Sequence, residues 1–438
     1  MISLTGKDKL KEVRKVRNLK RSPFYKEGEM KKRWILVALL MVVLLASGIA
    51  LAKTKVHFVA ARYHTGITDD YWAKVASEFE AANPDIDVVV DVIDWGTLHQ
   101  KLTTMIGAGK PPELANIATI WLPEYISAGV AEPLDKYMTP EFKEQFIQSL
   151  FDITVIDGKL YGIPIAVSAR AMFYLQDPLE KVGMAPPKNW EELLAVAKAI
   201  HNPPELYGFG IPCTTWEGEA YYAYFLWAAG GEFFDETGKF IVDSAEGIEA
   251  MQFLVDLVRK YKVTYPEPWA INRDEMQKVF AQGKIGMFIT GPWQVEINEK
   301  ENPDLRYGIT LIPAHRRQVT MAVTDTLMMY KGAPNKDAAW KFVEFAYQDN
   351  YRLEFDVNEG MLPEKKVVGE KIVEDAPYLK TFIDLLPYGK FLPMHPNWEE
   401  ITGEIVKQMQ LAYMGEKSPK QAMEDCAREV NTRIIIGF

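Results

Sequence analysis

The sequence predicts an α/β protein built from two doubly wound lobes, and three observations lead to this fold class. Residues 55–120 alternate strand, helix, strand, helix and strand, which is the order of a parallel doubly wound sheet. The chain has 438 residues, 48% of them hydrophobic, and is long enough to bury the cores of two such lobes. Phe280–Trp293 (FAQGKIGMFITGPW) then repeats the pattern of a helix end, a short apolar strand and an aromatic residue at the strand's carboxyl end.

Residues 30–52 have the pattern of a signal peptide. A basic start at 30–33 precedes the apolar run 34–46, and the small residues at 50–52 resemble a cleavage signal. We therefore expect an exported, periplasmic or extracellular protein that is cleaved near Ala52, with an uncleaved membrane anchor as the alternative. Residues 1–29 are basic and polar, and we interpret them as an upstream extension.

The charge of the chain is divided unevenly. The first 52 residues hold 12 Lys and Arg and 4 Asp and Glu, which leaves 38 basic and 56 acidic residues, a net charge of −18, for the rest. Such a chain has no electrostatic attraction for nucleic acid. The two cysteines, Cys213 and Cys426, and the six histidines show no metal-site spacing, so we expect neither a metal nor a cofactor.

The first lobe is predicted to begin at Lys55. The buried strand 55–60 is followed by a helix from Asp69, which has apolar residues at helical spacing until Asn83 and Pro84 stop it. A strand over 86–93, an amphipathic helix around 98–106 and a strand over 116–120 complete the pattern.

Polar and aromatic residues follow each of these three strands. They are Tyr63 and His64 after the first strand, Asp94 and Trp95 after the second, and Trp121 after the third. Ligands of open α/β sheets bind at the carboxyl ends of the strands, so we predict that these five residues contact a ligand.

The run 166–175 lacks a helical crossover, and we interpret it as a hinge strand that leads into a second lobe. Asn189 and Ser244 are predicted helix caps, and 216–231 is predicted as a loop that leads into a helix. The remaining elements are a strand over 307–313, an extended pair over 319–330, a helix over 335–348, an irregular crossing at 358–363, and helices over 398–413 and 418–435.

Four motifs in this order resemble the maltodextrin-binding-like solute-binding proteins of bacterial ABC importers. They are DGKLYGIPIAV at 157–167, FAQGKIGMFITGPW at 280–293, APNKDAAWKFVEFA at 333–346 and GEKSPKQAMED at 415–425. GKPPE at 109–113 is similar to the family's G-x-P-P-D segment, with Glu113 in place of Asp. The resemblance covers Lys53–Phe438.

The resemblance implies a monomer that closes on its ligand and delivers it to the membrane permease subunits of an ABC transporter. It implies three crossings between the lobes, near 163–170, 311–315 and 359–363. The first lobe is then 53–165 plus 314–360, and the second lobe is 166–313 plus 361–438.

Carbohydrate is the predicted ligand, because a sugar ring needs an aromatic platform for its C–H face and polar groups for its hydroxyls. The candidate indoles are Trp95, Trp121, Trp216, Trp269, Trp293 and Trp398. For any one of them the alternative is a packing role, which we assign to Trp190, Trp227 and Trp340. Ser168 occupies the hinge position where the family commonly has a carboxylate, and Arg170 beside it suits either an acidic sugar or a clamp on hydroxyls. The alternative for Arg170 is a surface position on the hinge.

Two other functions compete with this prediction. A secreted carbohydrate-active enzyme needs a carboxylate pair, for which Glu217, Glu219, Asp94 and Asp325 are available without a spacing motif. A binding protein for ferric ion could use Tyr221 and Tyr222, although neighbouring tyrosines in an aromatic helix mostly serve packing. We predict a binding protein and no enzyme.

Overall fold

The structure is a computed structural model that describes residue 34 and residues 53–214 and 217–435. The chain divides after Lys53, and Thr54–Phe438 form one compact unit. Apart from Trp34, the predicted signal peptide and the upstream extension lie outside the described residues. Among the described residues, no helix is both long and apolar enough to span a bilayer.

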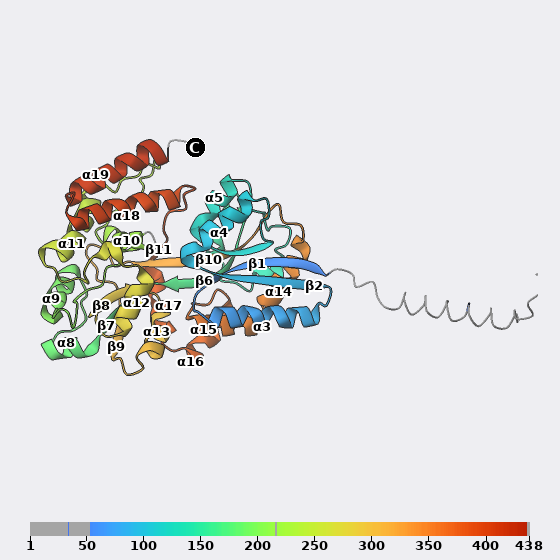
Figure 1. The fold of residues 1–438 in the computed structure, drawn as a ribbon, viewed down its shortest axis with the longest axis horizontal. Coiled ribbons are helices and arrows are strands. Elements are labelled where there is room, and N and C mark those ends of the chain that lie inside the picture. Colours follow the sequence, from blue (N-terminus) through green and yellow to red (C-terminus); the bar gives the residue numbers. More distant parts are fainter. Residues whose placement is uncertain (1–33, 35–52, 215–216, 436–438) are drawn as a thin grey trace, which may run out of the picture. The chain divides into compact units, whose positions relative to one another are not determined.

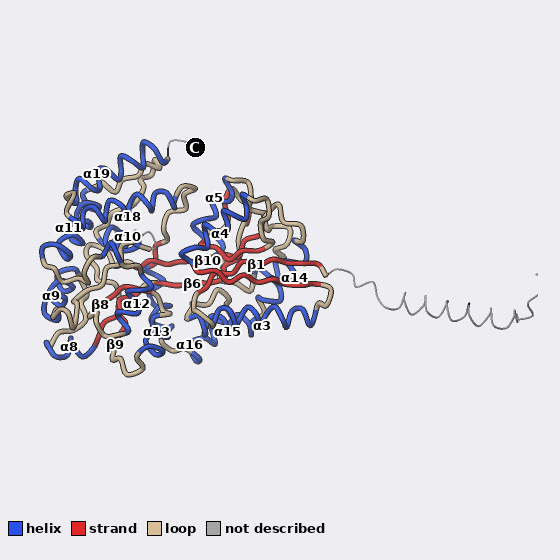
Figure 2. Tube along the Cα trace, in the orientation of Figure 1, coloured by secondary structure: helices blue, strands red, loops and turns tan. Residues whose placement is uncertain are grey.

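The larger sheet has six strands and includes the predicted parallel strands (Figure 2). Its order is β11-β10-β3-β1-β2, with β6 paired to β10. The strands are β1 (Thr54–Arg62), β2 (Ile86–Asp94), β3 (Leu114–Ala118), β6 (Ile163–Ala169), β10 (Thr320–Met329) and β11 (Gly389–Lys390). Strand β1 pairs in parallel with β2 and β3, which confirms the parallel sheet predicted for residues 55–120.

Strand β10 corrects one prediction. The segment 319–330 was expected to be an extended pair, but it forms a single strand that is antiparallel to β3 and β6. The segment contains no Gly or Pro that could form a turn, and both edges of the strand are hydrogen-bonded to neighbours. The long strand therefore crosses the sheet without a break.

We call the part built on the six-stranded sheet the first lobe. Its helices are α3 (Ile67–Ala82), α4 (Trp95–Gly107), α5 (Leu122–Ser127), α6 (Pro140–Lys143), α7 (Ser149–Asp152), α14 (Lys336–Ala346) and α15 (Asp349–Glu359), and a small hairpin joins β4 (Val155–Ile156) to β5 (Lys159–Leu160). The apolar side of α3 packs on the sheet, where the Trp72 and Phe58 rings lie 4.7 Å apart between centroids. Phe79 meets Phe342 of α14 at 5.3 Å.

The second lobe surrounds a three-stranded sheet of order β8-β7-β9 (Figure 1). Its strands are β7 (Ala171–Leu175), β8 (Met287–Thr290) and β9 (Tyr307–Thr310). All of their pairings are antiparallel, and the parallel bridges Tyr207↔Ile285 and Phe209↔Thr264 lie outside these strands.

We assign the following helices to the second lobe. They are α8 (Gln176–Val182), α9 (Trp190–Ile200), α10 (Gly218–Ala228), α11 (Ala245–Val255), α12 (Arg273–Ala281), α13 (Gln294–Glu301), α16 (Lys366–Asp375), α17 (Leu379–Leu385), α18 (Trp398–Met414) and α19 (Pro419–Glu429). The predicted caps are confirmed: the Asn189 side chain accepts a hydrogen bond from the Glu192 N–H at 2.8 Å, and that of Ser244 accepts one from the Gly247 N–H at 3.1 Å. Every residue of α10 is buried, so this helix is the centre of the second core.

The chain passes from the first sheet to the second at Arg170, which lies between β6 and β7. On the return, Ala314 still pairs with Asn189, and the backbone N–H groups of Arg316 and Arg317 donate to Ala228 of the second lobe. We therefore propose that the second crossing follows residue 317, later in the chain than 311–315. In the predicted third crossing (359–363), the Leu362 N–H donates to the carbonyl of Val167, in the predicted first crossing, at 2.7 Å. These two segments are therefore hydrogen-bonded to each other.

Candidate functional site

Two arginines and one carboxylate surround Trp293 at the end of β8. The Glu217 carboxylate accepts a hydrogen bond from the Arg170 guanidinium at 2.6 Å and another from that of Arg273 at 2.7 Å. Burial alone would raise the pKa of Glu217, but the two guanidinium charges outweigh it and lower this pKa to about 2. Glu217 is therefore ionised at neutral pH and holds both arginines in place.

The indole of Trp293 lies beside both guanidinium groups. Their central carbons are 4.7 Å (Arg170) and 5.2 Å (Arg273) from the ring centroid, within the range of cation–π attraction. A Cβ at Gly291 would lie 2.3 Å from the indole, so this glycine is required for the ring to fold back over the turn. Trp293 is 9% exposed and belongs to the same buried cluster as Phe58 and Phe355 of the first lobe. It therefore joins the two lobes and is not an open platform in this arrangement.

On the first-lobe side, three polar residues from three strands or strand ends lie together. The Tyr63 hydroxyl donates to Asp325 Oδ2 at 2.7 Å and lies 3.2 Å from Asn116 Oδ1. Burial raises the pKa of Asp325 to about 7, against the opposing effect of the Tyr63 hydrogen bond and the Arg170 charge. The charges of Arg170 and Arg273 therefore act on Asp325. Asn116 and Asp325 were not among the predicted ligand contacts, so they extend the candidate site.

The aromatic residues predicted at the strand ends do lie together. The Tyr63 and Trp95 rings meet edge to face at 5.6 Å, and the Trp95 and Trp121 rings meet at 6.0 Å. Trp95 is partly exposed, whereas Trp121 is 4% exposed and packs against His99 at 4.9 Å. Trp95 is therefore the more accessible ring of the pair.

His64 connects the first lobe to the third crossing. Its Nδ1 lies 2.9 Å from the fully buried Glu359 carboxylate at the end of α15, and 3.6 Å from Glu296 in α13 of the second lobe. Burial lowers the pKa of His64, but the hydrogen bond and charge of Glu359, together with the charge of Glu296, raise it above its ordinary value of 6.5. The imidazolium form is thus favoured by two carboxylates from two parts of the chain.

We expect the stabilising effect of His64 to depend on pH. A group whose pKa is raised on folding contributes fully below its unfolded value, here about 6.5, and the contribution disappears as the pH rises through the folded value. Urea unfolding should show wild type more stable than His64→Gln by about 1–2 kcal/mol at pH 5.5, with a smaller difference at pH 9. A difference that stays constant over this range would show that the imidazolium charge plays no part.

The other predicted site residues are placed as follows. The Ser168 hydroxyl accepts a hydrogen bond from Arg170 at 2.9 Å, which adds it to the arginine group. Asp94 is 69% exposed in its side chain and pairs with Arg62, outside the aromatic group. Trp269 packs partly buried against the second core, and Trp398 is 1% exposed and packs on Phe233 at 5.3 Å. Trp216 lies outside the described residues.

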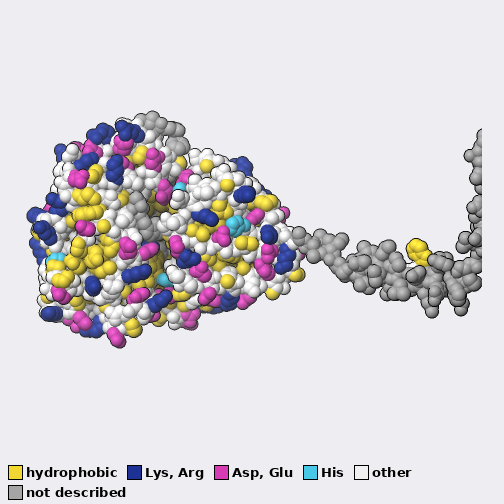
Figure 3. All heavy atoms as spheres, viewed as in Figure 1, with side chains coloured by type: hydrophobic (Ala, Val, Ile, Leu, Met, Phe, Trp, Pro, Cys, Tyr) yellow, Lys and Arg dark blue, Asp and Glu magenta, His cyan; other side chains and the backbone are white. Residues whose placement is uncertain are grey.

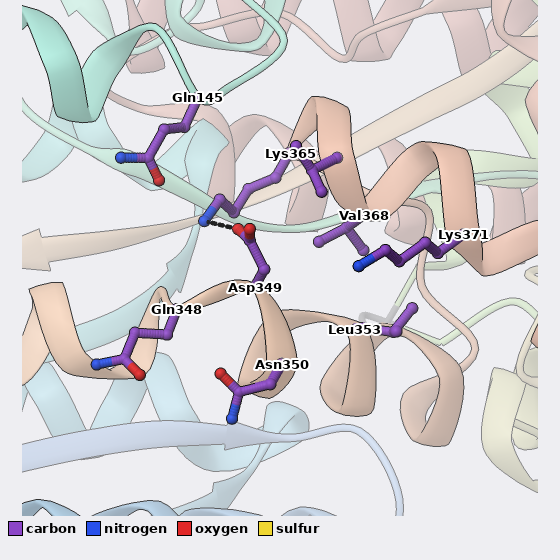
Figure 4. A pocket seen from close by; sticks show the side chains of 9 residues that line it. Gln145, Gln348, Asp349, Asn350, Leu353, Lys365, Val368 and Lys371 are labelled. Carbon is purple, nitrogen blue, oxygen red and sulfur yellow. Dashed lines mark hydrogen bonds and ion pairs between the residues drawn. The ribbon is translucent and has the colours of Figure 1, made fainter.

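Two cavities lie apart from Trp293 and from the aromatic residues at the strand ends of the first lobe. One of about 620 Å³ opens between α15 and α16, where the Lys365 ammonium is already paired with Asp349 (Figure 4). The other, of about 680 Å³, is lined by α3, α13 and α15 and includes Glu296 and Tyr378. Neither is lined by Trp293, Tyr63 or Trp95, so neither coincides with the predicted ligand contacts. Among the described residues, no group of three or more His, Cys, Asp or Glu side chains could hold a metal ion.

Comparison with known proteins decides the family. Residues 65–352 match the family described as bacterial extracellular solute-binding protein. The chain belongs to this family. A relative from Brucella abortus, named only as a binding protein, is 38% identical over 86% of this solute-binding protein and 92% of the relative. The maltotriose-binding protein of Pyrococcus abyssi is 26% identical over 76% and 72% of the two chains.

Solved structures agree with the fold. The ABC transporter solute-binding protein of Thermotoga lettingae, solved with α-D-tagatose, matches this solute-binding protein with a TM-score of 0.80 and 28% identity, over 86% of this chain and 99% of that one. Maltose-bound MalE3 of T. maritima matches with a TM-score of 0.78 and 24% identity, over 86% and 99%. The expected maltodextrin-binding type of fold is thereby confirmed.

Proposed function

We propose that this solute-binding protein captures a carbohydrate between its lobes. The observation that carries the proposal is a set of buried polar atoms that have no hydrogen-bond partner among the described residues, and Asn116 and Arg170, which carry two of them, belong to the groups described above. These atoms are Asn116 Nδ2, Arg170 Nε, Glu219 Oε2 and Thr324 Oγ1. Buried polar atoms are normally hydrogen-bonded, and this set offers both donors and acceptors. Sugar hydroxyls donate and accept at once, so a polyhydroxylated ligand satisfies such a set.

Aromatic rings beside these atoms support the same ligand class. Tyr63 contacts Asn116 and Asp325, and Trp95 packs on Tyr63. A pyranose or furanose packs its C–H face on such rings. Two similar proteins are described with carbohydrate ligands: one as a maltotriose-binding protein and one as solved with α-D-tagatose.

Closure of the two lobes supplies the mechanism. The chain changes sheets at Arg170, so the residue that carries an unpartnered donor lies at the crossing itself. A ligand that touches both lobes favours the arrangement in which they meet, because it has more contacts there. We propose that the closed, sugar-bound monomer then delivers its ligand to the membrane permease subunits of an ABC transporter, after export and cleavage near Ala52.

The contacts of the carboxylates and tyrosines support binding over the two competing functions. Both Glu217 oxygens are occupied by guanidinium groups, which leaves this carboxylate unsuited to act as a nucleophile or base. The Tyr221 hydroxyl donates to the Ile289 carbonyl, and that of Tyr222 donates to the Val242 carbonyl. Both tyrosines are core residues directed at different partners, so they do not form a ferric site. We propose that the protein has no catalytic activity, and hydrolysis of maltotriose by the purified chain would contradict this.

A thermal-shift screen of the mature chain, residues 53–438, tests the proposal. We expect at least one of tagatose, maltotriose, diacetylchitobiose or arabinooligosaccharides to raise the melting temperature, because a ligand at a thousand times its Kd stabilises by about 4 kcal/mol. Trp95→Ala should reduce the shift, whereas Tyr388→Ala, on the exposed surface, should leave it unchanged. A panel in which only amino acids, peptides or ferric ion raise the melting temperature would overturn the carbohydrate proposal.

A further inference from the structure

The Trp121 indole is hydrogen-bonded to the opposite lobe. Trp121 ends the short 3-10 helix Thr119–Trp121 that follows β3, and its Nε1–H donates to the Glu399 carboxylate. Glu399 is the second residue of α18, a helix that packs on α10, α11 and α19 of the second lobe. This hydrogen bond therefore spans the two lobes.

Each partner is fixed within its own lobe. Trp121 is buried in the first-lobe cluster with Leu98 and Tyr125, and the His99 ring that packs on it is itself tied to Glu124 at 2.8 Å. On the other side, Trp398 and Ile401 anchor the start of α18 in the second core. The orientation of the Trp121 indole and the position of the Glu399 carboxylate are thus set by different lobes. The two groups come into contact only when the lobes do.

An apolar contact accompanies the hydrogen bond. Met394, in the segment between β11 and α18, packs against the first-lobe cluster that contains Trp121, whereas Leu392 of the same segment belongs to the second core. The segment 391–399 therefore reaches from one lobe to the other. If the lobes met without an acceptor for the Trp121 N–H, a polar group would be buried without a partner, which is unfavourable.

We propose that Glu399 is a positioning residue that stabilises the closed arrangement by accepting the Trp121 N–H. It acts through Trp121, which adjoins Trp95, and not by contact with the ligand. The inference rests on the proposed function for its biological meaning, but closure itself can be measured without any sugar. A charge-assisted hydrogen bond of this kind is expected to change the ratio of closed to open molecules by about tenfold.

Distance measurement between spin labels on the two lobes tests the proposal in the unliganded mature chain. Val89 in the first lobe and Val182 in the second are exposed and can each be replaced by a labelled cysteine, while the native Cys213 and Cys426 are fully buried. Glu399→Ala and Trp121→Phe should each raise the ratio of open to closed molecules about tenfold, which is seen as a larger population at long label-to-label distances. Glu399→Gln, whose amide oxygen also accepts, should restore most of the closed population. Glu400→Ala, at a neighbour that is exposed as Glu399 is, should have no effect.

The double variant Glu399→Ala/Trp121→Phe separates this proposal from a direct role of Glu399. If the two residues act through one hydrogen bond, the double variant should be no more open than either single variant. Effects that multiply, or a distance distribution unaffected by Glu399→Ala, would overturn the proposal. A melting curve of each variant confirms that it folds. Because no sugar is present, the result is independent of the carbohydrate screen, whose failure would leave the closure result standing.

Discussion

Glu217→Ala is expected to lower the free energy of unfolding by about 3–5 kcal/mol and to abolish stabilisation by carbohydrate. The substitution leaves the Arg170 guanidinium, which is 2% exposed, without its carboxylate, and it releases Arg273 from Trp293. The cost arises from a buried charge that has lost its partner and not from a lost surface ion pair. Urea unfolding measures the first effect, and the thermal-shift screen measures the second.

Two comparisons make this expectation specific. Glu217→Gln keeps the shape of the side chain but not its charge and should lose most of the same stability, whereas Asp274→Ala, which removes the exposed partner of Arg273, should cost less than about 1 kcal/mol. Because the pKa of Glu217 is lowered from 4.5 to about 2, its contribution is present above pH 4.5 and is lost as the pH falls towards 2. A Glu217→Gln variant as stable as wild type at pH 7 would show that the arginines do not need this carboxylate.

The elements of the first lobe could be predicted because their signals are local. Strands β1 and β2 are apolar runs bounded by polar turns, and helix α3 between them has apolar residues at a spacing of three and four. Helix α15 was not predicted, since it carries few apolar residues, although Tyr351 and Phe355 lie four apart on its buried side. The single strand β10 depended on partners that lie more than 100 residues earlier in the chain, at β3 and β6.

The site was only partly predictable, for a physical reason. The rule that ligands lie at the carboxyl ends of strands correctly brought Tyr63, Trp95 and Trp121 together. It could not show that two guanidinium groups flank Trp293, because both are held there by Glu217, which lies 47 residues from Arg170 and 56 residues from Arg273 in the chain. Trp398 was predicted to contact the ligand but lies in the second core. The sequence could not separate the two roles, because a tryptophan at the start of a helix is equally suited to packing.

A second buried charge network connects α15 to the predicted crossings. The Arg352 guanidinium donates to Glu364 at 2.5 Å, to Asp356 at 3.3 Å and to the Ile165 carbonyl in β6, and all three charged side chains are fully buried. Ile165 belongs to the predicted first crossing and Glu364 follows the predicted third, so one arginine connects these two segments. Burial and the charge of Glu364 raise the pKa of Asp356 well above its ordinary value. Glu364 also makes the shorter contact with the guanidinium, so we take it as the main partner of Arg352.

Arg352→Met should therefore cost about 3–5 kcal/mol of unfolding free energy, because the Glu364 carboxylate stays buried without a counter-charge. Asp356→Asn is the matched control: the same position is occupied by a neutral group of similar shape, and less than about 1 kcal/mol should be lost in urea unfolding. Adding Glu364→Gln to Arg352→Met should recover part of the loss, since the uncompensated charge is then removed. If Asp356→Asn lowered the unfolding free energy as much as Arg352→Met, Asp356 would have to be ionised. Arg352 would then be paired with two carboxylates and not one.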